Sequence, residues 1–189
     1  MTERRDVPLF AWGEALRAAK RRRRLHRRTT MVALGCAGLV ATVVAPPLPR
    51  LVWNASASAP IGLYRVEPGR TVARGDMVIA RPPAAVRVMA ASRHYIAANV
   101  PLVKRVAAVP GDGICAHGAS ITVNGRAVAT RRAADRLGRP LPWWNGCQIL
   151  PDRTLFLLMA DTPDSFDGRY FGPTDAADVI GKATAAWLR

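Results

Sequence analysis

The longest uncharged stretch of the chain lies near its N-terminus, over residues 29–49. Its residues are mostly small and apolar, and a helix over 29–48 would be about 30 Å long, enough to span a bilayer core. Prolines at positions 46, 47 and 49 would end such a helix, because proline cannot extend the backbone hydrogen-bond ladder. The pattern therefore predicts a single transmembrane anchor over residues 29–49.

The rest of the chain alternates between short apolar runs and turn signals. The following runs favour strands: residues 63–66, 76–80, 102–109, 154–159, 179–180 and 183–188. The Asn124-Gly125 pair between alternating apolar residues predicts a tight hairpin, and the alanine-rich segment 84–97 favours a helix. We expect irregular loops over residues 131–150 and 160–175. Many short strands with one short helix predict a mainly β domain.

A basic run, residues 21–28, directly precedes the predicted anchor. Because positive charge beside a transmembrane helix favours the cytoplasmic side, we expect residues 1–28 in the cytoplasm, the helix in the inner membrane and residues 50–189 in the periplasm. Trp53 would then lie at the membrane interface. A cleaved secretory signal is the alternative, although its basic region would be unusually long. The basic run could also bind DNA, but the adjoining apolar run explains its position better.

The composition agrees with a folded domain and draws attention to one lysine. The 189 residues are 50% hydrophobic and carry a formal net charge of +15, which excludes an acidic disordered protein. Only three of the 28 basic residues are lysines: Lys20, Lys104 and Lys182. The Lys104-Arg105 pair is therefore of interest, because a lysine can lose its proton in a protein and an arginine cannot.

Few other chemistries are available to the exported part. Its two histidines, His94 and His117, do not complete a metal-ligand spacing with the cysteines, and no glycine-rich phosphate loop occurs. We therefore expect no metal and no cofactor, although spacing alone does not exclude a Ser-His-Asp triad. Cys115 and Cys147 predict a disulfide in an oxidising compartment, with two unpaired buried thiols as the alternative.

Lys104 lies within an apolar run, where loss of water would lower the pKa of its amine and allow it to act as a base toward a serine. Taken alone, such a lysine is better explained as an amine that reaches solvent from an edge strand. The interpretation as a base therefore depends on a serine partner.

Three segments together resemble the type I signal peptidases, which use a Ser-Lys dyad. They are residues 56–60 (Ser-Ala-Ser-Ala-Pro), residues 102–112 with Lys-Arg and Pro-Gly-Asp, and residues 161–169, which end Ser-Phe-Asp-Gly-Arg. Three further segments are similar to the TraF-type peptidases of conjugative transfer systems: residues 60–64, 138–142 and 165–173. The last block departs from ordinary leader peptidases, since it is one residue shorter and follows Ala160 in place of glycine. The resemblance implies an antiparallel β catalytic domain over residues 50–189, with a small hairpin-containing insertion at about 113–150.

The resemblance also implies roles for individual residues. Ser58 matches the nucleophile and Lys104 its general base, which removes the proton that makes a serine hydroxyl a poor nucleophile. Ser56 matches an oxyanion donor, with a plain linker serine as the alternative, and Ser165 matches the residue that orients the lysine. Three further residues match positions that support the site structurally: Asp167, Arg169 and Arg105. Trp143 and Trp144 would either dip into the bilayer surface or pack in the core.

These residues imply a membrane-anchored serine endopeptidase that cleaves an exported precursor after a small residue through an acyl-enzyme. The TraF-like segments imply a prepilin substrate in plasmid conjugation and type IV secretion, conjugation-apparatus proteins as partners, and no nucleic acid. An amine attacking the acyl-enzyme would also allow the pilin to be closed into a ring. Three alternatives stay open: a housekeeping signal peptidase I, a self-cleaving repressor, and a non-catalytic assembly protein of the conjugation channel.

Overall fold

The computed structural model describes residues 9–45 and 48–189 of the chain. It divides the chain into two compact units, residues 1–47 and residues 48–189.

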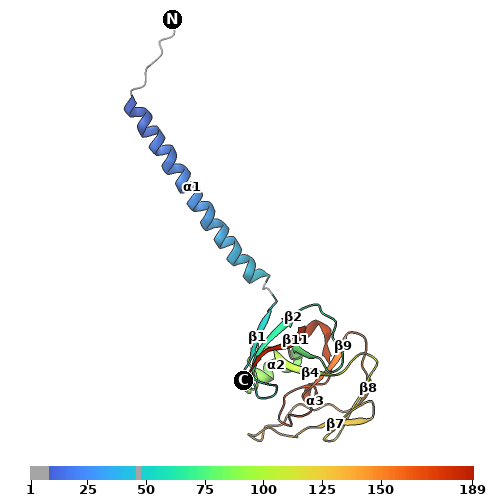
Figure 1. The fold of residues 1–189 in the computed structure, drawn as a ribbon. Helices are drawn as coiled ribbons and strands as arrows, with labels where there is room; N and C mark the ends of the chain where they lie inside the picture. The colour runs from blue at the N-terminus through green and yellow to red at the C-terminus, as the bar shows by residue number, and fades with distance from the viewer. Residues whose placement is uncertain (1–8, 46–47) are drawn as a thin grey trace. The chain divides into compact units, whose positions relative to one another are not determined.

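The first unit is one long helix, α1, which spans Leu9–Val44 (Figure 1). At about 1.5 Å per residue its 36 residues are about 54 Å long, so the helix continues well beyond the predicted anchor and includes the basic run. Among the described residues it is the one helix that is long and apolar enough to cross a membrane, and none of that apolar window is buried against protein. The prolines at positions 46 and 47, which we expected to end the helix, lie outside the described residues.

The second unit is built from two antiparallel sheets (Figure 1). The larger sheet has seven strands in the order β1-β2-β11-β3-β4-β9-β10. In chain order these strands are β1 Leu51–Asn54, β2 Gly62–Glu67, β3 Met77–Ala80, β4 Leu102–Ala108, β9 Thr154–Leu158, β10 Thr174–Asp175 and β11 Val179–Leu188. The smaller sheet has the order β7-β6-β5-β8, with β5 Gly113–His117, β6 Ser120–Val123, β7 Arg126–Thr130 and β8 Gly146–Ile149. The predicted mainly antiparallel β fold with a small hairpin-containing sheet is confirmed.

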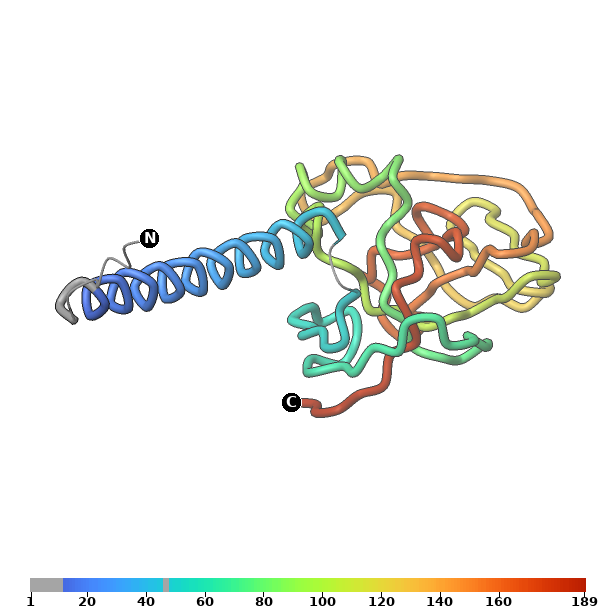
Figure 2. The backbone as a smooth tube through the Cα atoms, turned by 90° about the horizontal axis from the view of Figure 1, so that it is seen from above, coloured from blue at the N-terminus to red at the C-terminus, as the bar shows by residue number. Residues whose placement is uncertain are grey.

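The C-terminal strand β11 lies between β2 and β3 and pairs with both. In Figure 2 the red C-terminal end of the chain lies beside the cyan segment that contains β1 and β2. The two strands approach closely at Gly62, which has φ +155° and where a Cβ would overlap the Trp187 carbonyl oxygen. Pairing with β11 thus attaches the β1–β2 ribbon to the rest of the sheet.

The local predictions hold for most strands and are wrong in three places. The Asn124-Gly125 hairpin forms between β6 and β7 as predicted. The helix α2 spans Ala84–Ser92 and ends five residues early, because His94 takes a left-handed φ of 59°. The loop expected over 131–150 contains β8, which pairs with β5. The loop expected over 160–175 contains the short helix α3 (Gly168–Phe171) and strand β10, so the domain has more than one short helix.

Apolar side chains fill the space around the larger sheet and between the two sheets. One cluster combines Tyr64, Val66, Ile79 and Val103 with Met159, and a second joins residues of β5 and β6 to β9. Helix α3 and the residues before it lie against β9. The core therefore fixes the relative positions of β2, β4 and the end of β9. The candidate site residues lie just before β2, within β4 and after β9.

Candidate active site

Lys104 lies in β4, flanked by β3 on one side and β9 on the other, so the lysine is on an interior strand and not on an edge. Its side chain is only 1% exposed. The amine donates hydrogen bonds to Ser58 Oγ at 2.9 Å and to Ser165 Oγ at 2.7 Å. The structure thus brings together three of the predicted residues, which are separated by 46 and 61 positions along the chain.

Burial lowers the pKa of Lys104 from 10.5 to about 8, because the ammonium has little contact with water. The nearby Asp167 carboxylate acts in the opposite direction, and Arg169 lowers the pKa further. At pH 7 an amine with this pKa is neutral in about one molecule in ten, against about one in 3,000 at the ordinary value. The site can therefore hold a neutral lysine beside a serine hydroxyl near physiological pH.

Ser58 and Ser56 lie in the turn between β1 and β2, residues 55–61. Ser56 Oγ is 3.0 Å from Ser58 Oγ, and the Ser58 backbone N–H donates to Ser56 Oγ at 3.3 Å. The Ser58 side chain is half-buried, whereas Ser56 is exposed to solvent. The two hydroxyls and the Ser58 N–H therefore lie together at the surface of the site, where a substrate carbonyl could reach them.

Asn54 organises this turn and was missed by the sequence analysis. It is buried at the end of β1, and its side-chain amide donates to the carbonyl oxygens of Ser56, Ala59 and Pro60 at 2.9, 3.1 and 3.0 Å. Its Oδ1 accepts from the Ser56 backbone N–H at 3.1 Å. One side chain thus satisfies much of the backbone around Ser58. An asparagine at the end of a strand and before small residues was the available signal, since this side chain commonly bonds nearby backbone in turns.

Asp167 and Arg169, which the resemblance implied as structural support, form an ion pair shortly after Ser165 in the chain. Arg169 Nε donates to Asp167 Oδ1 at 2.8 Å, and both side chains are at most 1% exposed. Asp167 Oδ2 accepts from the Met159 N–H at 3.0 Å, and Arg169 Nη2 donates to the Met159 carbonyl at 2.7 Å. Arg169 Nη1 also reaches the carbonyls of Thr130 and Pro163. The pair fixes the loop that carries Ser165 to the ends of β9 and β7.

Arg105 does not join this group. It follows Lys104 in β4, so its side chain lies on the opposite, exposed face and donates to the Gly75 carbonyl at 2.8 Å. Its contact is with the turn that precedes β3. The supporting role that the resemblance implied has no counterpart within the Ser58–Lys104 site.

An open cleft of about 810 Å³ leads to Ser58 and Lys104. One side is formed by the β1–β2 turn, and others by the segment after α2 and by residues 132–141, which carry several arginines. Two tryptophans lie beyond this segment. Trp144 packs against Phe156 and donates to the Gly168 carbonyl at 3.0 Å, so it belongs to the core. Trp143 is exposed, with the Arg131 guanidinium 3.6 Å from its ring centre.

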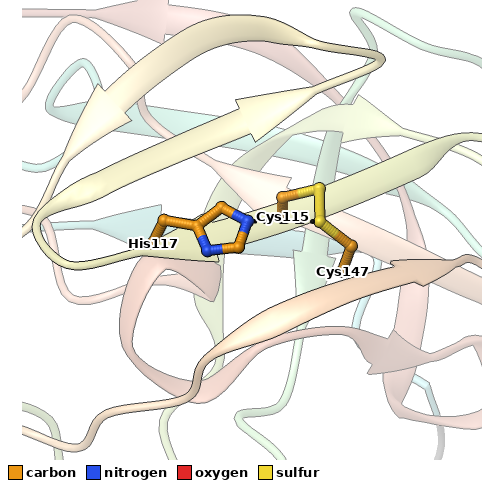
Figure 3. A group of neighbouring side chains, drawn as sticks. All are labelled: Cys115, His117 and Cys147. Atoms are coloured by element: carbon orange, nitrogen blue, oxygen red, sulfur yellow. Dashed lines mark hydrogen bonds between the residues drawn. A yellow bond between two sulfur atoms is a disulfide. The ribbon is translucent and has the colours of Figure 1, made fainter.

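The predicted disulfide between Cys115 and Cys147 is present and links opposite positions of β5 and β8. The ring of His117 is directed toward it, with Nε2 3.4 Å from Cys147 Sγ (Figure 3). Together these three residues have the donor types of a metal site. Because the two sulfurs are bonded to each other, neither is a thiolate, which is the form that binds a metal. The group therefore does not fit a metal in this state.

Comparison with known proteins agrees with the geometry. The plasmid transfer protein TraF of Escherichia coli is 34% identical over 167 residues, which cover 83% of this chain and 94% of that protein. The conjugal transfer protein TraF of Agrobacterium tumefaciens is 33% identical over 84% of this chain and 94% of its own length. A solved signal peptidase I from Enterococcus faecalis aligns with 61% of this chain and 98% of that chain at 18% identity, but its TM-score of 0.37 is too low to bear on the assignment.

The sequence profile described as "Signal peptidase, peptidase S26" matches residues 23–188, nearly the whole chain. Together with the TraF relatives, this match assigns the chain to a family of serine peptidases. The N-terminal apolar helix of this chain is consistent with membrane anchoring. The chain belongs to the signal peptidase family, peptidase S26, and is of the TraF type.

Proposed function

We propose that this protein is a membrane-anchored endopeptidase in which Ser58 is the nucleophile and Lys104 the general base. The observation that carries the proposal is the 2.9 Å contact between Lys104 Nζ and Ser58 Oγ, made by an amine that is almost completely buried. Residues 29–49 would form the anchor in the inner membrane, residues 1–28 would be cytoplasmic, and residues 50–189 would form the periplasmic catalytic domain.

The reaction would begin with the neutral form of Lys104. Its amine accepts the Ser58 hydroxyl proton as Oγ attacks the scissile carbonyl, which gives a tetrahedral intermediate and an ammonium. The Ser58 N–H and the Ser56 hydroxyl, which lie beside Ser58 Oγ, would turn to donate to the negative oxygen, and one such donor is typically worth about 3–4 kcal/mol. The ammonium then returns its proton to the leaving amine, and an acyl-enzyme on Ser58 remains.

Water completes the reaction by the reverse use of the same groups. Lys104 takes a proton from the attacking water, the tetrahedral intermediate collapses, and Ser58 Oγ regains the proton as the carboxylic acid leaves. A primary amine could replace water and form a new peptide bond, which is the step needed to close a cleaved pilin into a ring. Ser165 would hold the lysine amine in place throughout, and the Asp167–Arg169 pair would hold the loop that carries Ser165.

The substrate class follows from the TraF relatives, whose names associate them with plasmid and conjugal transfer. We expect an exported precursor, a prepilin, with small residues before the cleaved bond. The surroundings of the protein would be the conjugation apparatus. A housekeeping signal peptidase would use the same chemistry, and the two roles separate in cells: only a housekeeping enzyme should support growth when the resident signal peptidase is depleted.

The proposal is tested by following the precursor in cells that carry the surrounding transfer genes. Ser58→Ala and Lys104→Ala should leave the protein in the membrane fraction while the precursor accumulates uncut and transfer frequency falls to background. Ser92→Ala is the matched control, because Ser92 is exposed on α2 and does not line the cleft. Normal processing by the Lys104→Ala protein would refute the mechanism.

The pH dependence gives an independent test. Since the reaction needs neutral Lys104, kcat/KM should rise tenfold per pH unit and level off above pH about 8. A profile that still rises steeply at pH 10 would indicate a lysine with its ordinary pKa, and the proposed base would then be wrong.

A further inference from the structure

The cleft beside Ser58 and Lys104 is lined by more positive than negative charge. Among the described residues that line it, the charged side chains other than Lys104 are Arg93, Arg132, Arg136, Arg139, Asp135 and Asp164. Four guanidinium groups thus face two carboxylates. Even with a neutral Lys104, the lining carries a net charge of +2, and no histidine contributes to it.

One of the two carboxylates already accepts several hydrogen bonds from neighbouring groups of the protein. Asp135 accepts hydrogen bonds from the Tyr95 hydroxyl, from the backbone N–H groups of Leu137 and Arg139, and from Arg139 Nε at 2.7 Å. These donors, the Tyr95 hydroxyl first among them, hold the pKa of Asp135 well below its usual range. Asp135 therefore neutralises Arg139 and orders the loop around residues 135–139. Asp164 is then the one remaining carboxylate of the described cleft lining for the other three arginines.

Those three arginines, Arg93, Arg132 and Arg136, form what we call the arginine cluster. Arg132 and Arg136 share Asp164, at 3.0 and 2.7 Å. Arg93 donates to the Pro140 carbonyl oxygen and has no carboxylate partner among the described residues. The three guanidinium groups thus have a single carboxylate partner in all within the described part of the chain, which leaves positive charge for a further anion, and Arg136 keeps 82% of its side chain exposed.

The arginine cluster lines the same cleft as Ser58 and Lys104. Asp164 directly precedes Ser165, whose hydroxyl is 2.7 Å from the Lys104 amine, and consecutive Cα atoms are about 3.8 Å apart. All three arginines also line the cleft that holds Ser58. A peptide chain that occupies the cleft would therefore pass close to the cluster while its scissile carbonyl lies at Ser58.

We propose that the arginine cluster binds a carboxylate of the precursor near the scissile bond. Guanidinium groups match the geometry of a carboxylate and bind it through paired hydrogen bonds. The carboxylate could belong to an aspartate or glutamate side chain or to a free C-terminus close to the cleaved bond, since the chemistry is the same. This inference rests on the proposed peptidase function and adds to it a charge requirement in the substrate.

An anionic lipid headgroup is a different ligand for the same charges. The concave position of the cluster, in one cleft with the nucleophile, favours a peptide over a membrane surface. The binding of vesicles is therefore an outcome that the experiment has to separate from the binding of substrate.

The probe is a set of fluorescent alanine-rich peptides, tested with the full-length protein in neutral detergent. One glutamate or glutamine is placed in turn at each position around the scissile Ala bond, and each peptide is made with a free or an amidated C-terminus. The Ser58→Ala protein is used for binding by anisotropy and the wild type for kcat/KM. We expect at least one carboxylate to improve both by about 2- to 5-fold over its uncharged partner, and the position identifies whether a side chain or a terminus is bound.

Two variants should change this preference in opposite directions. The double variant Arg132→Gln, Arg136→Gln should bring the ratio of kcat/KM for the carboxylate peptide to kcat/KM for its uncharged partner close to one. Asp164→Asn removes the competing carboxylate and should increase the ratio, a direction that a merely structural role of Asp164 would not produce. Arg126→Gln is the matched control, because Arg126 is exposed on β7 outside the cleft and should keep the wild-type ratio.

The results that overturn the inference are distinct from those that overturn the peptidase function. Equal binding and cleavage of acidic and uncharged peptides by the wild type would remove the charge requirement and leave the dyad intact. Loss of binding to phosphatidylglycerol vesicles in the double arginine variant, with an unchanged peptide ratio, would reassign the cluster to lipid. Cleavage by the Ser58→Ala protein would instead refute the proposed nucleophile.

Discussion

Replacement of Lys104 by methionine should make the protein more stable while it abolishes activity. The amine is buried, and its pKa of about 8 lies below the ordinary 10.5. That difference corresponds to about 3 kcal/mol by which the folded state disfavours the ammonium. Methionine has a similar length and no charge, so it removes this cost. It also removes the hydrogen bonds to Ser58 and Ser165, worth about 1 kcal/mol each, which leaves a net gain of about 1 kcal/mol at pH 7.

The gain should depend on pH in a defined window. The unfolded chain keeps its lysine proton up to about pH 10.5, whereas the folded protein releases it near pH 8, so the stability of the wild type rises between these values. Below pH 8 the cost of the buried ammonium is fully present. Above pH 10.5 it is absent, and the wild type should then be more stable than the Lys104→Met variant.

The assay is urea unfolding of the full-length proteins in detergent, followed by tryptophan fluorescence between pH 6 and pH 11. Lys182→Met is the control, because this lysine is partly exposed and pairs with Asp76 at 2.8 Å. Its loss should lower the free energy of unfolding at pH 7 by up to about 1 kcal/mol, the opposite sign. A Lys104→Met variant that is no more stable than the wild type at pH 7 would refute the reasoning that desolvation activates this amine.

Three further predictions concern the groups around the lysine. Ser165→Ala should lower kcat/KM by about 100-fold with an unchanged fold, because the amine loses the contact that positions it; normal peptide cleavage would show that Ser58 positions it alone. Asp167→Ala should lower the free energy of unfolding by about 3–5 kcal/mol, since Arg169 is left as an unpaired buried charge, and a loss under 1 kcal/mol in urea unfolding would show that water reaches it. Replacement of Cys115 and Cys147 by serine should cost about 4 kcal/mol on the chain-entropy account, with peptide cleavage retained at low temperature; unchanged stability would mean that the linked loop is already ordered without the bond.

Strands and the tight turn were predictable because their signals are local. Alternating apolar residues and Asn124-Gly125 determine β6 and β7 with little help from the rest of the chain. Strand β8 was not predictable in this way, since its residues are mostly exposed and it forms because Cys147 lies opposite Cys115. The early end of α2 depends on the left-handed conformation of His94. The pattern of apolar residues along the sequence does not indicate such a conformation.

The proposed catalytic pair could be named from sequence only through resemblance. Position within an apolar run did not distinguish a buried amine from one that reaches solvent, and the pairing of β4 with both neighbours was needed to decide it. Asn54 was overlooked because its role consists of bonds to backbone atoms several residues away. The charge balance of the arginine cluster likewise depends on which carboxylates other groups already occupy.

The placement of β11 has a consequence for when the enzyme becomes active. Within the described part of the chain, the strand pairing that joins the β1–β2 ribbon to β3 and β4 runs through β11 alone. With Ser58 and Lys104 acting as proposed, the nucleophile would be synthesised long before β11, the strand that attaches its ribbon to the strands beside the base. On that proposal, the ability to cut would arise only after β11 has been made and has paired with β2 and β3.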